Sequence, residues 1–118
     1  MILKEKADYC LGCINKNCRS GCPLSNDITQ SIRYVKEGKI DEAYKEFSKT
    51  TVLSSVCGRV CPHSKQCQGK CVRAIKGNSV EIGEIEAEIG DYGLYYNIPF
   101  ANIEKCEKLD KKVAIIGS

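Results

Sequence analysis

The chain has 118 residues, enough for one small domain, and nine of them are cysteine, which is far above ordinary globular usage. Its net charge of +3 comes from scattered Lys and Arg, and two Phe with no Trp leave little to stack on bases, so nucleic acid is excluded as a partner. No signal peptide and no apolar run of transmembrane length is present, so we expect a cytoplasmic protein with reduced thiols.

The first cysteine group is CLGCINKNCRSGCP, residues 10–23, with the spacing C-x2-C-x4-C-x3-C followed by proline. Grouped cysteines in a reducing compartment are metal ligands more often than disulfides. We therefore interpret this group as part of a metal site.

Two short helices are expected next. Ser25, Asn26 or Asp27 can cap a helix whose apolar positions recur through residues 28–35, and Gly38 fits its C-terminal end. Residues 41–50 predict a second helix with Ala43, Tyr44 and Phe47 on one face. The short connection favours an antiparallel pair that serves as a scaffold.

The second cysteine group, CGRVCPHSKQCQGKC, spans residues 57–71 and is followed by a turn at 76–80. Residues 82–97 predict a third helix. Its apolar stripe consists of Ile82, Ile85, Ile89, Tyr92 and Tyr96.

The C-terminal part resembles a linker that contains Cys106 and then gives way to KKVAIIGS. A short apolar run before Gly-Ser is how a dinucleotide-binding βαβ unit opens, although a frayed terminal strand fits these eight residues equally well.

The cysteine spacing favours iron–sulfur over zinc. Zinc sites use pairs of the C-x2-4-C type, and the second group has no C-x2-C. Bacterial ferredoxins use C-x2-C-x2-C-x3-C-P, in which the cysteine before proline binds the other cluster. By that pattern Cys10, Cys13 and Cys18 bind one cluster, Cys22 binds a second, and one cysteine of residues 57–71 returns to the first.

The chain up to about residue 108 resembles the N-terminal helical iron–sulfur domain of NADPH-dependent glutamate synthase small (beta) subunits. The same domain begins dihydropyrimidine dehydrogenase and the large subunit of NADH-dependent ferredoxin–NADP oxidoreductase. CLGCINKNCRSGCP, VCGRVCPHSKQCQGKC and VRAIKGNSVEIGEIE carry the resemblance. It implies an all-α fold similar to an alpha-helical ferredoxin over residues 1–108. Residues 109–118 are similar to the first strand of an FAD-binding Rossmann-type domain that is otherwise missing.

The resemblance also implies two [4Fe-4S] clusters and their ligands. The ligands are Cys10, Cys13, Cys18 and Cys71 for one cluster, and Cys22, Cys61, Cys67 and Glu86 for the other. Cys57 matches a cysteine that is not a ligand and is the alternative to Glu86 as fourth ligand. His63 is a further possible metal ligand, but seven cysteines are better candidates. Basic residues beside the ligands, at Arg19, Arg59, Lys65, Lys70 and Arg73, either offset cluster charge or are ordinary surface cations.

The expected function is electron transfer within an NAD(P)H-dependent flavoprotein oxidoreductase. The implied partners are the FAD- and NAD(P)H-binding part of the same parent chain and a larger catalytic subunit, such as a glutamate synthase large subunit or a ferredoxin-linked subunit. No nucleophile–base pair or carboxylate pair stands out, so we expect no turnover by this chain alone, and we expect no membrane partner. The alternatives are a zinc-binding structural or interaction module without redox function and a metal-free helical domain with reactive thiols.

Overall fold

The computed structural model describes residues 2–101 and 106–117. Within these ranges it contains helices and turns but no strand, so the all-α prediction is confirmed for the described part of the chain. The elements are α1 (Leu3–Asp8), α2 (Asn17–Gly21), α3 (Ile28–Lys36), α4 (Ile40–Ser48), α5 (Ser54–Val60), the 3-10 turns η1 (His63–Lys65), η2 (Gln68–Lys70) and η3 (Val72–Ile75), and α6 (Ile82–Tyr95). Across these ranges no helix is both long enough and apolar enough to cross a membrane.

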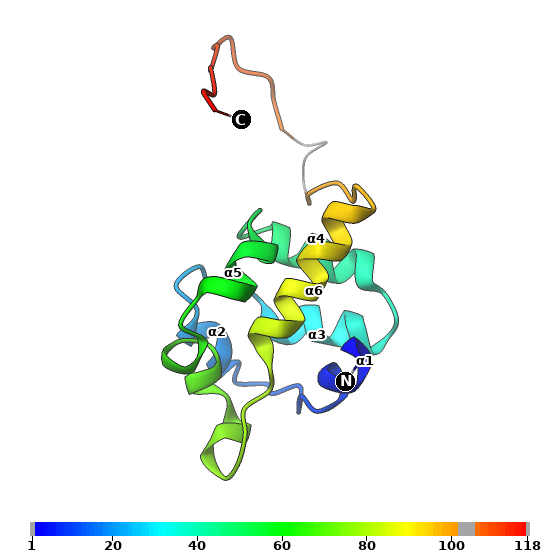
Figure 1. Ribbon diagram of the computed structural model, residues 1–118, viewed down its shortest axis with the longest axis vertical. Helices are drawn as coiled ribbons and strands as arrows, with labels where there is room; N and C mark the ends of the chain where they lie inside the picture. Colours follow the sequence, from blue (N-terminus) through cyan, green and yellow to red (C-terminus); the bar gives the residue numbers. More distant parts are fainter. Residues whose placement is uncertain (1, 102–105, 118) are drawn as a thin grey trace.

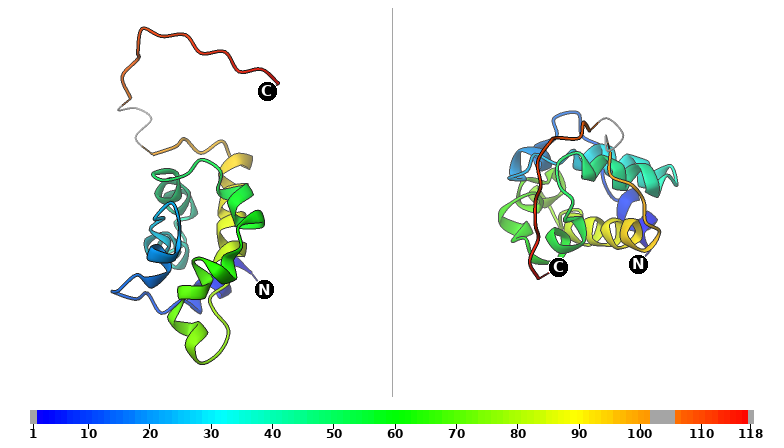
Figure 2. Two further views of the ribbon diagram at one scale, coloured as in Figure 1. Left: turned by 90° about the vertical axis from the view of Figure 1, so that its left-hand side faces the viewer. Right: turned by 90° about the horizontal axis from the view of Figure 1, so that it is seen from above.

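The helices form two sides of the domain. Helices α3 and α4 pack together on one side, and α5 and α6 pack together on the other (Figures 1 and 2). Helix α1 contacts both α3 and α6 and so joins the two sides. Apolar side chains fill the space between them, namely Ala7, Ile28, Ile32, Val35, Ala43, Tyr44, Phe47, Val80, Ile82, Ile85 and Ile89.

Helix α3 is the predicted first helix, and its cap is now identified. The side chain of Asp27 accepts a hydrogen bond from the backbone N–H of Gln30, at 3.2 Å, so Asp27 is the N-cap among the three candidates. Gly38 follows the helix with φ +77°, a left-handed conformation that glycine adopts without steric cost. Asn26, the neighbouring candidate, is buried and bonded to Thr50 instead.

The predicted stripe of α6 is correct at the three isoleucines and wrong at its end. Ile82, Ile85 and Ile89 are all at most 2% exposed. Tyr96 is 58% exposed, because the helix ends at Tyr95 and Tyr96 only caps it. Its ring instead contacts that of Tyr92, with centroids 4.6 Å apart and the ring planes tilted by 48°.

The segment at 109–117 has no strand geometry in the structure and runs away from the helical domain (Figure 1). A β-strand needs neighbouring strands for its backbone hydrogen bonds, and none of the described segments is a strand. That this run opens a Rossmann-type domain therefore stays a prediction.

Helices α5 and α6 approach closely through glycines. A Cβ atom added at Gly58 of α5 would overlap the backbone of Ala87, and one added at Gly90 of α6 would overlap the backbone of Ser55. The sequence provides no side chain at either point, so the two backbones lie in contact. This contact fixes the position of α5, which contains Cys57 and is followed directly by Cys61.

We predict that Gly58→Ala lowers the free energy of unfolding by about 1–3 kcal/mol, because the added methyl group must displace packed backbone. The matched control is Gly77→Ala. There the nearest atom, the carbonyl oxygen of Arg73, lies 3.9 Å from the new Cβ, so the change should stay within about 0.5 kcal/mol. Urea denaturation of both variants and the wild type, followed by circular dichroism under anaerobic conditions, measures the difference. Equal stability of the two variants would contradict the close contact.

Candidate iron–sulfur site

Four cysteines from both groups line one cavity. These are Cys10, Cys13, Cys18 and Cys71, the set that the family resemblance implies for one cluster. The cavity has a volume of about 400 Å³, including the open space at its mouth. Its other walls are mostly apolar, and Ile28, Ile32 and Ile82 come from the core.

Local structure explains how these four positions meet. Helix α1 ends before Cys10, and Gly12 with φ +67° turns the loop toward α2, where Cys18 lies. Lys36 donates a hydrogen bond to the backbone carbonyl of Cys10 at 2.6 Å and so ties this loop to α3. Cys71 has extended backbone between η2 and η3 and completes the cavity from the second group.

A second cavity, of about 500 Å³, is lined by the remaining residues of the predicted set. Cys22, Cys61, Cys67 and Glu86 all lie on its wall, and Cys57 lies there too. Cys22 caps α2 at its C-terminal end, Cys61 caps α5, and Glu86 comes from the middle of α6. The structure thus brings together both candidates for the fourth ligand and does not choose between them.

The two cavities are neighbours. Ile28, the first residue of α3, lies on the wall of both and is 2% exposed. Helix α2 carries Cys18 into the first cavity, and Cys22 follows it into the second.

Burial raises the pKa values of side chains on both cavity walls. Burial raises the pKa of the Cys67 thiol to about 12. Burial also raises the pKa of the Cys18 thiol, and the contact with Thr29 only partly offsets that rise. Burial also raises the pKa of the Glu86 carboxyl to about 7. Glu86 is 5% exposed, and its Oε1 has no hydrogen-bond partner among the described residues. Buried thiols and a carboxyl without a partner fit a bound cationic group that they would ligate.

Among the described residues, neither cavity gathers three ligands around the position of a single metal ion. Over residues 2–101 and 106–117, no three His, Cys, Asp or Glu side chains lie close enough together to hold one metal ion. A tetrahedral zinc ion with Zn–S bonds of about 2.3 Å brings its sulfurs within about 4 Å of one another. An iron–sulfur cluster is a larger body and holds its thiolates farther apart.

Of the basic residues beside the cysteines, Arg73 lies on the wall of the first cavity. Its guanidinium stacks on the ring of Tyr9, 4.3 Å from the centroid, and donates to the Tyr9 carbonyl. Arg59 is paired with Asp91 on the outer surface, which supports the reading of an ordinary surface cation. Arg73 therefore lies beside the first cavity, and the Arg59–Asp91 pair links α5 to α6.

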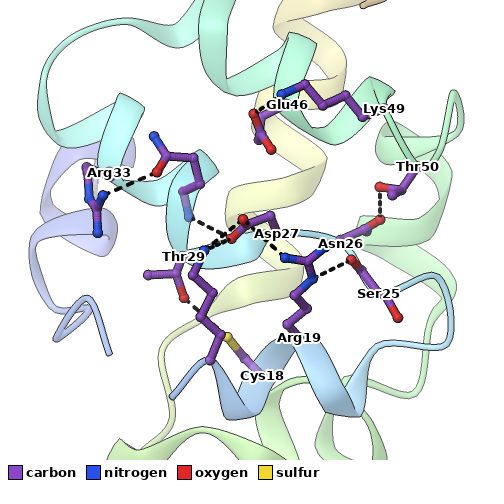
Figure 3. Close-up of polar contacts among 12 residues, drawn as sticks. Cys18, Arg19, Ser25, Asn26, Asp27, Thr29, Arg33, Glu46, Lys49 and Thr50 are labelled. Atoms are coloured by element: carbon purple, nitrogen blue, oxygen red, sulfur yellow. Dashed lines mark hydrogen bonds and ion pairs between the residues drawn. The ribbon is translucent and has the colours of Figure 1, made fainter. Parts of the chain in front are cut away.

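Arg19 has a different role, which Figure 3 shows. It donates to the carbonyl of Ser25 at 3.0 Å and contacts Asp27, which Lys16 also binds. These bonds hold the loop between Cys22 and α3, and through it the point where the chain passes from one cavity to the other.

Two further residues line the cavities: Thr29, which was not predicted, and His63, which was predicted as a metal ligand ranked below the seven cysteines. The Thr29 hydroxyl lies 3.7 Å from the Cys18 sulfur in the first cavity, and His63 lines the second. Thr29 directly follows the shared wall residue Ile28, and His63 follows Cys61-Pro62. For Thr29, closeness in sequence to Ile28 is the signal that could have indicated it.

Comparison with known proteins gives a family match. The family described as dihydropyrimidine dehydrogenase domain II, 4Fe-4S cluster, matches residues 2–98. Among curated proteins, the chain is 37% identical over 115 residues to the glutamate synthase [NADPH] small chain of Escherichia coli, covering 98% of this chain and 24% of that protein.

Two further relatives are oxidoreductase subunits. Identity is 37% over 101 residues to the NADPH-Fe(3+) oxidoreductase subunit beta of Geobacter sulfurreducens, with 86% of this chain and 15% of that protein covered. Identity is 30% over 114 residues to the NAD-dependent dihydropyrimidine dehydrogenase subunit PreT of E. coli, with 97% and 27% covered. The chain therefore spans about a quarter or less of the length of these relatives.

We predict that iodoacetamide at pH 8 modifies Cys67 of the metal-free chain much more slowly than the exposed Cys106. A pKa of about 12 leaves about a thousandfold less thiolate than an ordinary thiol has. Because the pKa is raised, the thiolate fraction and the rate at Cys67 should rise about tenfold for each pH unit from 8 to 10. Peptide mass spectrometry of timed anaerobic samples measures both rates. Equal rates at pH 8 would contradict the burial of Cys67.

Proposed function

The chain belongs to the dihydropyrimidine dehydrogenase domain II, 4Fe-4S cluster family, and from that membership we propose that it binds two [4Fe-4S] clusters and transfers electrons between them. Its relatives are oxidoreductases, including the glutamate synthase small chain. The observation that carries the proposal is the division of the cysteines between two cavities, four on each wall.

The proposed ligands follow that division. The first cluster is held by Cys10, Cys13, Cys18 and Cys71, and the second by Cys22, Cys61, Cys67 and a fourth residue, for which we propose Glu86 with Cys57 as the alternative. The burial of Glu86 and its unpartnered Oε1 support its choice. A buried carboxylate is otherwise costly, and an iron ligand role explains its presence.

When bound, such clusters accept and donate single electrons. The chain's own residues set the surroundings. Ile28, Ile32 and Ile82 exclude water from the first cavity, and Ile28 separates it from the second. One buried side chain that belongs to both walls makes the two cavities neighbours, which supports the proposed electron transfer between them. Arg73 adds positive charge beside the first cavity.

We propose the parent protein by analogy with the relatives. Residues 1–108 are the iron–sulfur domain, and residues 109–118 are the start of a domain that binds FAD and, with a further domain, NAD(P)H. Electrons then pass between the flavin and a larger partner subunit, such as a glutamate synthase large subunit or a ferredoxin-linked subunit. The location proposed is the cytoplasm, in keeping with reduced thiols.

Single cysteine variants test the proposal. Cys71→Ser should remove the first cluster and Cys67→Ser the second, so each variant should hold about half the iron and acid-labile sulfide of the wild type. Cys106→Ser is the matched control, since Cys106 is exposed and lies on neither cavity wall, and it should keep the full content. A wild type that contains zinc and no sulfide would replace the redox proposal with a structural zinc module.

A pair of variants tests the fourth ligand of the second cluster. We expect Glu86→Ala to change the electron paramagnetic resonance spectrum and midpoint potential of that cluster, because an iron loses its carboxylate ligand. Cys57→Ser should leave both unchanged. The reverse result would assign the fourth bond to Cys57.

A further inference from the structure

His63 lies on the wall of the second cavity in a place shaped for its ring. It begins η1, directly after Cys61-Pro62. The ring packs against Gly83 in the first turn of α6, where an added Cβ would lie 2.5 Å from Cε1, 2.7 Å from Nδ1 and 2.8 Å from Nε2. Any larger residue at position 83 would displace the imidazole, so the ring position depends on this glycine.

One nitrogen of the His63 ring lacks a protein partner. Nε2 is buried and has no hydrogen-bond partner among the described residues. A neutral imidazole whose Nε2 carries no proton has its lone pair available to bind a metal ion.

The second cavity contains more potential ligands than one cluster needs. The first cavity has four cysteines and no His, Asp or Glu on its wall. Its other ionisable wall residue is Arg73, a cation that does not bind metals. The second has four cysteines, Glu86 and His63. Glu86 lies three residues after Gly83 on α6, so the two positions share one face of the helix. Because the His63 ring packs on Gly83, the unpartnered Oε1 of Glu86 and the unpartnered Nε2 of His63 belong to neighbouring positions of the cavity wall.

We propose that His63 is an additional iron ligand, binding through Nε2 in competition with Glu86 at the fourth iron of the cluster in the second cavity. This rests on the proposed function, because it requires a cluster there. In this exchange one iron–oxygen bond would break and one iron–nitrogen bond would form, with no change in the number of electrons. A neutral imidazole in place of a carboxylate makes the cluster one charge less negative, so the form bound to His63 is the easier one to reduce.

The experiment uses the fact that the 118-residue chain contains one histidine. The chain is produced with 15N-labelled histidine, purified anaerobically and reduced with dithionite. Pulsed electron paramagnetic resonance then measures the coupling between the cluster and the labelled nitrogen. Unlabelled protein is the control for backbone nitrogens. The variants are Glu86→Ala, which removes the competitor, and the double variant Glu86→Ala/His63→Leu.

We expect Glu86→Ala to retain the second cluster and to show the strong 15N coupling of a directly bound imidazole. The double variant should show none. Two results would overturn the proposal: Glu86→Ala with an intact second cluster but without strong 15N coupling, or Glu86→Ala that loses the second cluster while keeping the first. Iron and sulfide analysis of the wild type separates these failures from that of the proposed function, which would appear as absence of clusters.

Discussion

The burial of thiols and a carboxyl among apolar side chains is the constraint on which the rest of this structure depends. Cys67 and Glu86 are each 5% exposed. Burial raises both pKa values, which favours the neutral thiol and the neutral carboxyl. Charged ligands in such surroundings are stable only when a cation compensates them. Three core isoleucines, Ile28, Ile32 and Ile82, also line the first cavity, so core packing and the candidate metal site share these residues.

Helix α6 connects packing with the second cavity. Its residues Gly83 and Gly90 allow close approach by His63 and by the backbone of α5, and the same helix carries Glu86. A shift of α5 along α6 would move Cys57 and Cys61 relative to Glu86. Small residues at these contacts therefore set the shape of the candidate site without contributing any ligand.

The sequence predicted the parts of the fold that have a clear apolar period. Helices α3, α4 and α6 follow stripes of buried residues, and their places were predictable. Helices α1, α2 and α5 have only five to seven residues, too few to show a period. In α5 the apolar Val56 and Val60 are more than half exposed, because the helix packs through Gly58 instead.

The candidate site was likewise predictable only in part. Cysteine spacing indicated iron–sulfur chemistry, but only the family resemblance paired Cys71 with the first group and drew attention to Glu86. The sequence gives no reason to include Thr29 and ranks His63 below the seven cysteines, because the place of each residue depends on how the chain folds around the cavity. The position of the His63 ring depends on Gly83, twenty residues further along the sequence, and local patterns do not record such a contact.

The measurement that tests the central claim most directly is an X-ray diffraction experiment on anaerobic crystals at the iron absorption edge. The account predicts two separate peaks of anomalous density, one among Cys10, Cys13, Cys18 and Cys71, and one beside Cys22, Cys61 and Cys67, each with the strength of about four irons. A single peak, or peaks at the zinc edge with none at the iron edge, would contradict it.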